Sequence, residues 1–136
     1  MTIDPTADQV RALRDGPAKG PIVMVNMLKF RDRAAYPEDF DGDADIPGSE
    51  AYARYQHAFT VTVGDTSKAE VLYDGPVQQV FIGEPGTSAT DWDKMLIVRY
   101  PSKEHFLGMM ANEEYRANLV HRYAGLERTV LLQCKG

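Results

Sequence analysis

At the centre of this chain lies Pro21-Ile22-Val23-Met24-Val25-Asn26-Met27-Leu28-Lys29-Phe30, an almost unbroken apolar run between Gly20 and Arg31. A run this rich in β-branched and other apolar residues predicts a central strand that is buried on both faces. Because side chains alternate along a strand, one face carries Ile22, Met24, Asn26, Leu28 and Phe30, and the other carries Val23, Val25, Met27 and Lys29. Asn26 therefore points into an apolar layer, where its amide needs a partner from the protein, from water or from a ligand.

Composition and charge narrow the class of protein. We expect one domain over residues 1–136, with an N-terminal helical appendage at about 6–16 and a core at about 20–136. A formal net charge of −5, with scattered lysines and arginines, argues against nucleic-acid and membrane partners, which need a basic patch. The single Cys134 fits a reducing compartment, and neither an export signal nor a membrane span is expected, so we predict a cytoplasmic protein.

The other segments predict the remaining elements from their periodicity, caps and turn residues. We expect a helix over 6–16, an acidic surface loop over 31–48, a helix from Ser49 to Gly64, a kinked strand over 69–84, a strand over 92–100, helices capped by Ser102 and Asn112, and a last strand over 128–134. The resulting order, β-α-β-β-α-β, is the ferredoxin-like arrangement of the α+β class.

Several short motifs, taken in order, resemble one protein family. They are the central strand itself, Tyr52-Ala53-Arg54-Tyr55, Trp92-Asp93, Arg99-Tyr100-Pro101-Ser102, Glu114-Tyr115 and His121-Arg122. Over roughly residues 21–132 the chain resembles the bacterial domain-of-unknown-function family 1330 (DUF1330). The resemblance implies a dimeric α+β barrel, in which two ferredoxin-like sheets pack face to face and each subunit keeps a pocket between sheet and helices. Relatives in that superfamily include cofactor-free oxygenases, lactone isomerases, polyketide cyclases and haem enzymes, so the fold does not define the function.

One set of polar and aromatic residues predicts a binding site. Asn26 on the strand, Tyr52 and Tyr55 on one helix face, and Tyr115 and Arg122 on another cover the same sheet, so they are expected to converge. A guanidinium, an amide and phenols suit a carboxylate, an enolate or a phenolate. In this interpretation Arg122 orients an anion, Asn26 hydrogen-bonds a carbonyl or a developing oxyanion, and the tyrosines form the walls of a pocket for a small organic molecule.

Two interpretations of this set stay open. In the first, the protein acts on its ligand by cofactor-free acid/base or monooxygenase-type chemistry, and the catalytic candidates are Asn26, Arg122 and His121. His121 lies beside the Arg122 stripe rather than on it, which makes it the weakest of the three. In the second, the protein is a non-catalytic dimeric module, where Arg122 binds backbone carbonyls or an acid such as Glu127 or Asp93 and Asn26 bridges strands.

The acidic loop contains one partial metal motif. Asp39, Asp41, Asp43 and Glu50 occupy the first, third, fifth and twelfth positions of a calcium loop. The sixth position is Ala44, where the motif needs glycine for a sharp turn, so a solvated acidic loop is the expected structure. We expect neither a metal nor a cofactor.

The predicted sheet also bears on assembly. Both faces of its strands are largely apolar, but the predicted helices suffice to cover only one of them. The other face would leave a large apolar patch on a monomer. We therefore expect a homodimer whose interface exceeds ~2,000 Å² in total.

Overall fold

The computed structural model describes residues 3–136. Its elements are α1 (Ala7–Asp15), β1 (Ile22–Phe30), α2 (Gly48–Ser67), β2 (Glu70–Pro76), β3 (Lys94–Tyr100), α3 (Lys103–Met110), α4 (Glu113–Ala117), α5 (Leu119–Gly125) and β4 (Leu126–Lys135). The strands form an antiparallel sheet in the order β2-β3-β1-β4, which is the ferredoxin-like α+β fold predicted from the sequence. Within the described residues, no helix is both long and apolar enough to cross a membrane.

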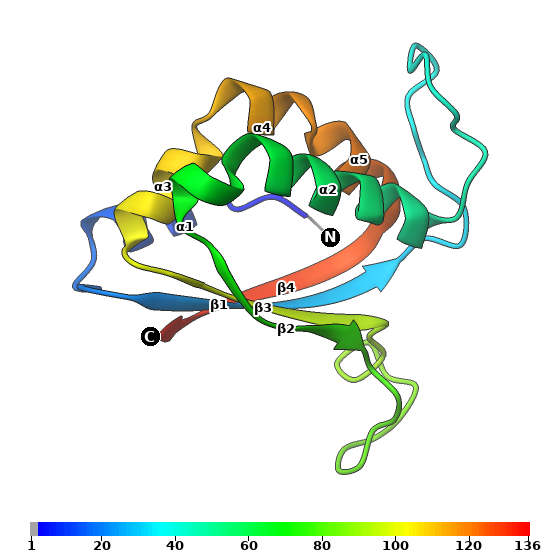
Figure 1. The fold of residues 1–136 in the computed structure, drawn as a ribbon. Coiled ribbons are helices and arrows are strands. Elements are labelled where there is room, and N and C mark those ends of the chain that lie inside the picture. Colours follow the sequence, from blue (N-terminus) through cyan, green and yellow to red (C-terminus); the bar gives the residue numbers. More distant parts are fainter. Residues whose placement is uncertain (1–2) are drawn as a thin grey trace.

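The helices form one layer over one face of the sheet, and the other face is open (Figure 1). The core lies between the layers. It includes Ile22, Met24 and Leu28 from β1, Leu96, Val98 and Tyr100 from β3, Tyr52, Tyr55 and Val63 from α2, and Phe106, Met109, Tyr115 and Leu126 from the C-terminal part of the chain. This two-layer arrangement leaves a single sheet face with a helical cover.

The central strand has the two faces that its sequence predicts. β1 pairs with β3 on one side and with β4 on the other. Ile22, Met24 and Leu28 are at most 5% exposed because they face the helices. Val23 and Val25, on the opposite face, are only half-buried. Burial on both faces is therefore not reached within one chain, since no helix of the described residues covers the second face.

The second helix differs from the prediction at both ends. It begins at Gly48 after Pro47, which provides no side-chain cap, and it continues through Gly64 to Ser67. The extension buries Ser67, one turn beyond Val63, on the same helix face. The chain then turns at Lys68, which has a φ of 55° in the left-handed region. Glycine is thus not the residue that ends this helix.

The segment predicted as one kinked strand is a strand followed by a loop. β2 ends at Pro76, and its kink is a register shift against β3 between Val71 and Tyr73. Proline cannot donate to the next rung of the sheet, so residues 77–93 leave it and form a long connection to β3. At the other end of the chain, β4 begins at Leu126 rather than Arg128, because Leu126 is fully buried against the helices.

Two glycines bring α2 and α5 into close contact. A Cβ atom built on Gly125 would lie 2.6 Å from the carbonyl oxygen of Gly48 and 2.9 Å from the backbone nitrogen of Tyr52. Only glycine allows two backbones to approach so closely. The contact fixes the start of α2 against the end of α5, and it thereby sets the position of Tyr52 relative to Arg122.

Replacement of Gly125 with alanine should lower the free energy of unfolding by ~1–3 kcal/mol, because the added methyl group has no space. Urea denaturation followed by circular dichroism measures the change. The matched control is Gly108→Ala in α3, where no described atom outside the local helix lies within 4 Å of the new Cβ. That control should gain about 0.5–1 kcal/mol from helix propensity. Equal losses in both variants would contradict the close-packing explanation.

Candidate functional site

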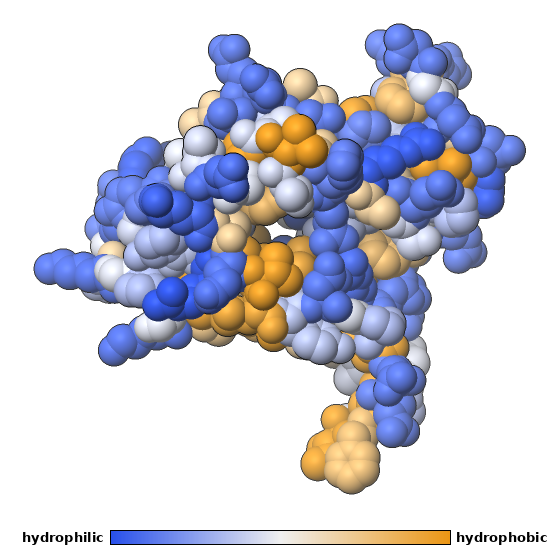
Figure 2. Space-filling view, in the orientation of Figure 1, coloured by the Kyte–Doolittle hydropathy of each residue, from blue (hydrophilic) through white to orange (hydrophobic). Residues whose placement is uncertain are grey.

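A cleft of about 1350 Å³ lies between the sheet and the helices. Figure 2 shows an opening between the two layers, with apolar side chains below it. The sheet contributes Met24, Asn26, Leu96, Val98 and Leu131, the helices contribute Tyr52, Tyr55, Phe59, Phe106, Tyr115 and Arg122, and the N-terminal segment contributes Ile3, Asp4 and Pro5. All five predicted ligand-binding residues therefore line one cleft.

Asn26 occupies the sheet wall of this cleft. Its Nδ2 donates a hydrogen bond to the carbonyl oxygen of Leu96 at 3.1 Å, which links β1 to β3. This bond is the strand bridge that the structural interpretation predicts. It uses one of the two amide N–H groups, and no described residue donates to Oδ1. One donor and one acceptor of Asn26 thus remain for a bound molecule.

Arg122 is largely buried, with a side chain that is 13% exposed. Its Nη1 donates to the carbonyl oxygen of Ile3 at 2.6 Å and lies 3.8 Å from Oδ1 of Asp4. Neither suggested partner, Glu127 or Asp93, takes that place in the described residues. A guanidinium has five N–H donors in a fixed fork, and these contacts occupy only part of it. The remaining donors are on the wall of the cleft.

The tyrosines form a buried aromatic wall beside Arg122. The hydroxyl groups of Tyr55 and Tyr115 are hydrogen-bonded to each other at 2.8 Å. Tyr52 is 2% exposed, and its ring centroid lies 5.2 Å from that of Tyr55. No hydrogen bond joins the Tyr52 hydroxyl to any described residue. Since no fully buried side-chain polar atom of the described residues lacks a partner, this hydroxyl lies at the surface of the cleft, where a ligand or water can bond to it.

The same phenols are neutral at physiological pH. Burial raises the pKa of Tyr52 well above its ordinary value, and the nearby positive charge of Arg122 offsets only part of the rise. Burial also raises the pKa of Tyr55 and the pKa of Tyr115. Neutral phenols donate hydrogen bonds and do not repel an anion, so the charges in this part of the cleft are those of Arg122 and of Asp4, which lies 3.8 Å from it.

His121 lies outside the cleft. Its Nδ1 is 2.7 Å from the hydroxyl of Tyr36, and its ring packs edge-on against Phe40. Burial lowers the pKa of His121, and the charge of Arg54 lowers it further. The contacts fasten the 31–48 loop to α5. Because His121 directly precedes Arg122, the two side chains lie about 100° apart around the helix axis, which agrees with the prediction that His121 lies beside the Arg122 stripe.

Sequence reasoning missed two groups that line the cleft. The first is the N-terminal segment: the helix at 6–16 was interpreted as an appendage, but its Leu13 lines the cleft together with Ile3 and Asp4, which precede it. The second is the pair Gln56 and Asp74, which line the cleft and are joined by Lys94, whose Nζ lies 2.7 Å from both Asp74 Oδ1 and Gln56 Oε1. An apolar Ile3 directly before an acid was a weak local signal for the first. The second depends on the β2–β3 register and had no local signal.

The partial calcium motif does not form a cluster of acids. Asp45 is ion-paired with Arg33, and its backbone nitrogen donates to Asp43 Oδ1 at 3.1 Å. Ile46 is buried against Ala51 and Ala124, which turns the loop towards α5. Among residues 3–136, no group of three or more histidine, cysteine, aspartate or glutamate side chains is arranged to hold a metal ion.

Comparisons with known proteins show the family. The RPA0582 protein of Rhodopseudomonas palustris, described as a protein of unknown function, is 32% identical over 98% of this chain and 95% of that chain, with a TM-score of 0.85. The methylated RPA0582 protein gives 32% identity over 99% and 94%, with a TM-score of 0.80. A dimeric protein of unknown function and ferredoxin-like fold from Bacteroides fragilis NCTC 9343 shares the fold, at 11% identity over 85% and 96% with a TM-score of 0.51. No protein-family model and no curated protein matches the chain. Since the similarity to RPA0582 extends over nearly the whole of both chains, this chain belongs to the family of the RPA0582 protein.

Proposed function

We propose that this protein is a cytoplasmic homodimer of the DUF1330 type, each subunit of which binds a small organic molecule that carries a carboxylate or a carbonyl group. The observation that carries the proposal is Arg122, a guanidinium only 13% exposed on the wall of a cleft of about 1350 Å³. A buried positive charge with unused donors favours an exchangeable anion. The ordered motifs, from Tyr52-Ala53-Arg54-Tyr55 to His121-Arg122, support the DUF1330 assignment.

The side chains that line the cleft indicate the chemical class of the ligand. Arg122 pairs with the anionic group, and the Tyr52 hydroxyl donates a further hydrogen bond to it. Asn26 offers its second N–H to a carbonyl and its Oδ1 to a hydroxyl or an amide N–H of the ligand. Phe59, Phe106 and Leu96 supply apolar surface around these groups. A small aromatic or branched aliphatic carboxylate satisfies both the polar and the apolar parts.

Catalysis within this proposal needs no cofactor. Arg122 would stabilise the negative charge of an enolate or a phenolate, and the second N–H of Asn26 would hydrogen-bond the developing oxyanion. Acid/base or monooxygenase-type reactions of aromatic substrates pass through such anions: a substrate that enters the cleft already ionised needs no base on the protein, and in the monooxygenase case dioxygen is the oxidant and the substrate itself the reductant. His121 is bonded to Tyr36 outside the cleft, so the proposal assigns it no proton transfer.

A non-catalytic structural role is the second candidate, and specific contacts favour it. Arg122 already binds the carbonyl oxygen of Ile3, and Asn26 already bridges β1 and β3. Two measurements distinguish ligand binding from a purely structural role: native mass spectrometry of protein purified without added ligand, and a thermal-shift screen of small carboxylates. A co-purified molecule or a ligand-dependent rise in melting temperature supports binding. If no molecule co-purifies with the protein and no carboxylate raises its melting temperature, the structural role is supported.

The homodimer in this proposal is supported by the open face of the sheet. Directly paired residues of antiparallel strands share a face, so Ile97, Val25 and Leu132 form one row across β3, β1 and β4. Tyr73 of β2 continues the row, and it is 49% exposed. Met27, Met95 and Val130 form the next row. Such a contiguous apolar patch marks a protein interface.

Replacement of Tyr52 with phenylalanine should weaken carboxylate binding by about tenfold, which corresponds to the loss of one hydrogen bond of ~1.4 kcal/mol. It should leave the melting temperature of the free protein unchanged, because the hydroxyl has no bonding partner among the described residues. The matched control is Tyr55→Phe, which breaks the 2.8 Å bond to Tyr115 and should cost ~1 kcal/mol of stability. Isothermal titration calorimetry and urea denaturation measure the two effects, and reversed effects would contradict the assignment.

A further inference from the structure

The connection between β2 and β3 projects away from the sheet on the side opposite to the helices (Figure 1). This projection, residues 77–93, is called the hook below. Phe81 and Ile82 of the hook are each 88% exposed, more than any other large apolar residue of the described chain. Figure 2 shows apolar side chains at its far end. Adjacent aromatic and aliphatic side chains held in water are typical of a surface that another molecule covers.

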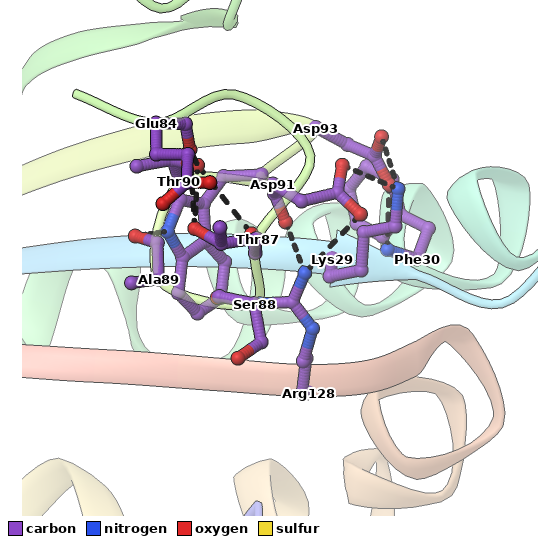
Figure 3. Close-up of polar contacts among 11 residues, drawn as sticks. Lys29, Phe30, Glu84, Thr87, Ser88, Ala89, Thr90, Asp91, Asp93 and Arg128 are labelled. Carbon is purple, nitrogen blue, oxygen red and sulfur yellow. Dashed lines mark hydrogen bonds and ion pairs between the residues drawn. The ribbon is translucent and has the colours of Figure 1, made fainter. Parts of the chain in front are cut away.

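The base of the hook is held in place by hydrogen bonds and ion pairs (Figure 3). The backbone nitrogen of Val77 donates to the carbonyl oxygen of Asp93 at 2.9 Å and closes the loop. Within it, Thr87 and Thr90 share a hydrogen bond of 2.9 Å between their hydroxyl groups, and Trp92 Nε1 donates to the carbonyl oxygen of Ala89 at 2.9 Å.

Two cations of the open sheet face anchor the hook to the sheet. Lys29 and Arg128 are paired neighbours on β1 and β4. Lys29 forms ion pairs with Asp91 and Asp93 of the hook at 3.2 and 3.3 Å. Arg128 donates to the carbonyl oxygen of Ser88 at 2.6 Å, and its guanidinium lies 4.4 Å from the centre of the Trp92 ring. These contacts hold the hook in a fixed direction, out from the open face.

The area of the open sheet face, compared with the area that a stable dimer buries, indicates which molecule covers the end of the hook. Four strands about 4.8 Å apart and about eight residues long, at about 3.3 Å per residue, give a flat face of roughly 500 Å² per subunit. Two such faces give roughly 1,000 Å² of flat area, to which the relief of the side chains adds, whereas an obligate homodimer buries about 2,000 Å² or more of accessible surface. Phe81 and Ile82, with the surface they would cover on a second copy, raise the total to about 2,000 Å². The hook supplies the area that the sheet face lacks.

We propose that the hook clasps the second copy of this chain, and that Phe81 and Ile82 are buried against the partner subunit. The inference rests on the homodimer of the proposed function and deepens it. In a two-fold dimer the contact occurs twice, because each subunit both extends a hook and receives one. Since the hook and the open face lie on the same side of the sheet, a copy that covers the face lies within reach of the hook.

The double variant Phe81→Ser/Ile82→Ser tests the clasp. Sedimentation equilibrium should show a dimer dissociation constant at least about 100-fold above that of wild type, because four apolar side chains are removed from the interface. The melting temperature measured at a monomeric concentration should not change, since both side chains are exposed within one subunit. The matched control is Val61→Ser, which removes a 69% exposed apolar side chain from α2 on the helix side and should leave the dimer unchanged.

Each alternative outcome has a separate meaning. If the wild-type chain is still monomeric at about 100 μM, both the homodimer and the clasp are wrong. A double variant that dimerises as tightly as wild type would overturn the clasp and leave the sheet-face dimer standing. Binding of the wild type, but not of the double variant, to phosphatidylglycerol vesicles with an unchanged dimer constant would overturn the clasp in favour of a lipid surface.

Discussion

The Ile97→Glu variant should be monomeric under conditions in which the wild-type chain is a dimer. Ile97 is in the middle of the open sheet face, opposite Val25 on β1 and Tyr73 on β2. A glutamate there would place two unpaired carboxylates inside a face-to-face interface, at a cost of several kcal/mol. The dimer dissociation constant should rise by more than about 100-fold, since each 1.4 kcal/mol is a factor of ten. Light scattering after size-exclusion chromatography measures the change.

The matched control for this variant is Val61→Glu. It introduces the same charge at a more exposed apolar position, on α2 at the helix side of the molecule. That variant should remain dimeric and as stable as wild type. A dimeric Ile97→Glu variant would mean that the subunits associate through another surface, and the sheet-face interface would have to be abandoned.

The Arg122→Met variant should lose carboxylate binding while it keeps its fold. The protein partners of Arg122 are a backbone carbonyl and Asp4, whose side chain is 52% exposed. Removal of the guanidinium therefore strands no buried charge, and the free energy of unfolding should change by no more than about 1 kcal/mol. Loss of a charge-assisted hydrogen bond of ~1.5–3 kcal/mol should weaken binding by roughly 10- to 150-fold. Calorimetric titration with a carboxylate from the thermal-shift screen measures the loss.

The control for this prediction is Arg11→Met. Arg11 is an exposed arginine of α1 that is ion-paired with Asp8 and does not line the cleft. It should bind the carboxylate as wild type does. A loss of ~3–5 kcal/mol of stability in Arg122→Met would instead support the structural interpretation, in which Arg122 balances an internal acid. Unchanged binding in Arg122→Met would place the anion elsewhere.

Elements whose patterns are local could be predicted from the amino-acid sequence. The apolar run of β1, with its alternation between Met24 and Val25, predicted a central strand and both of its faces. The caps of α3 and α4 are Ser102 and Asn112, as predicted, because a cap is a contact over three residues. The shared cleft of Asn26, Tyr52 and Arg122 follows from the same patterns, since helix stripes and strand faces that cover one sheet must meet.

The groups that these side chains contact could not be predicted in this way, because they depend on how distant segments pack. Arg122 binds Ile3, which is 119 residues away in the chain, and no periodicity relates those two positions. The pairing of His121 with Tyr36 depends on the path of a long loop, and the approach of Gly125 to Gly48 depends on how two helices pack. The direction of the hook is set by Lys29 and Arg128 on strands far from it in sequence. Local patterns encode which face a residue occupies, whereas its partner is selected by packing between segments that meet only in the folded chain.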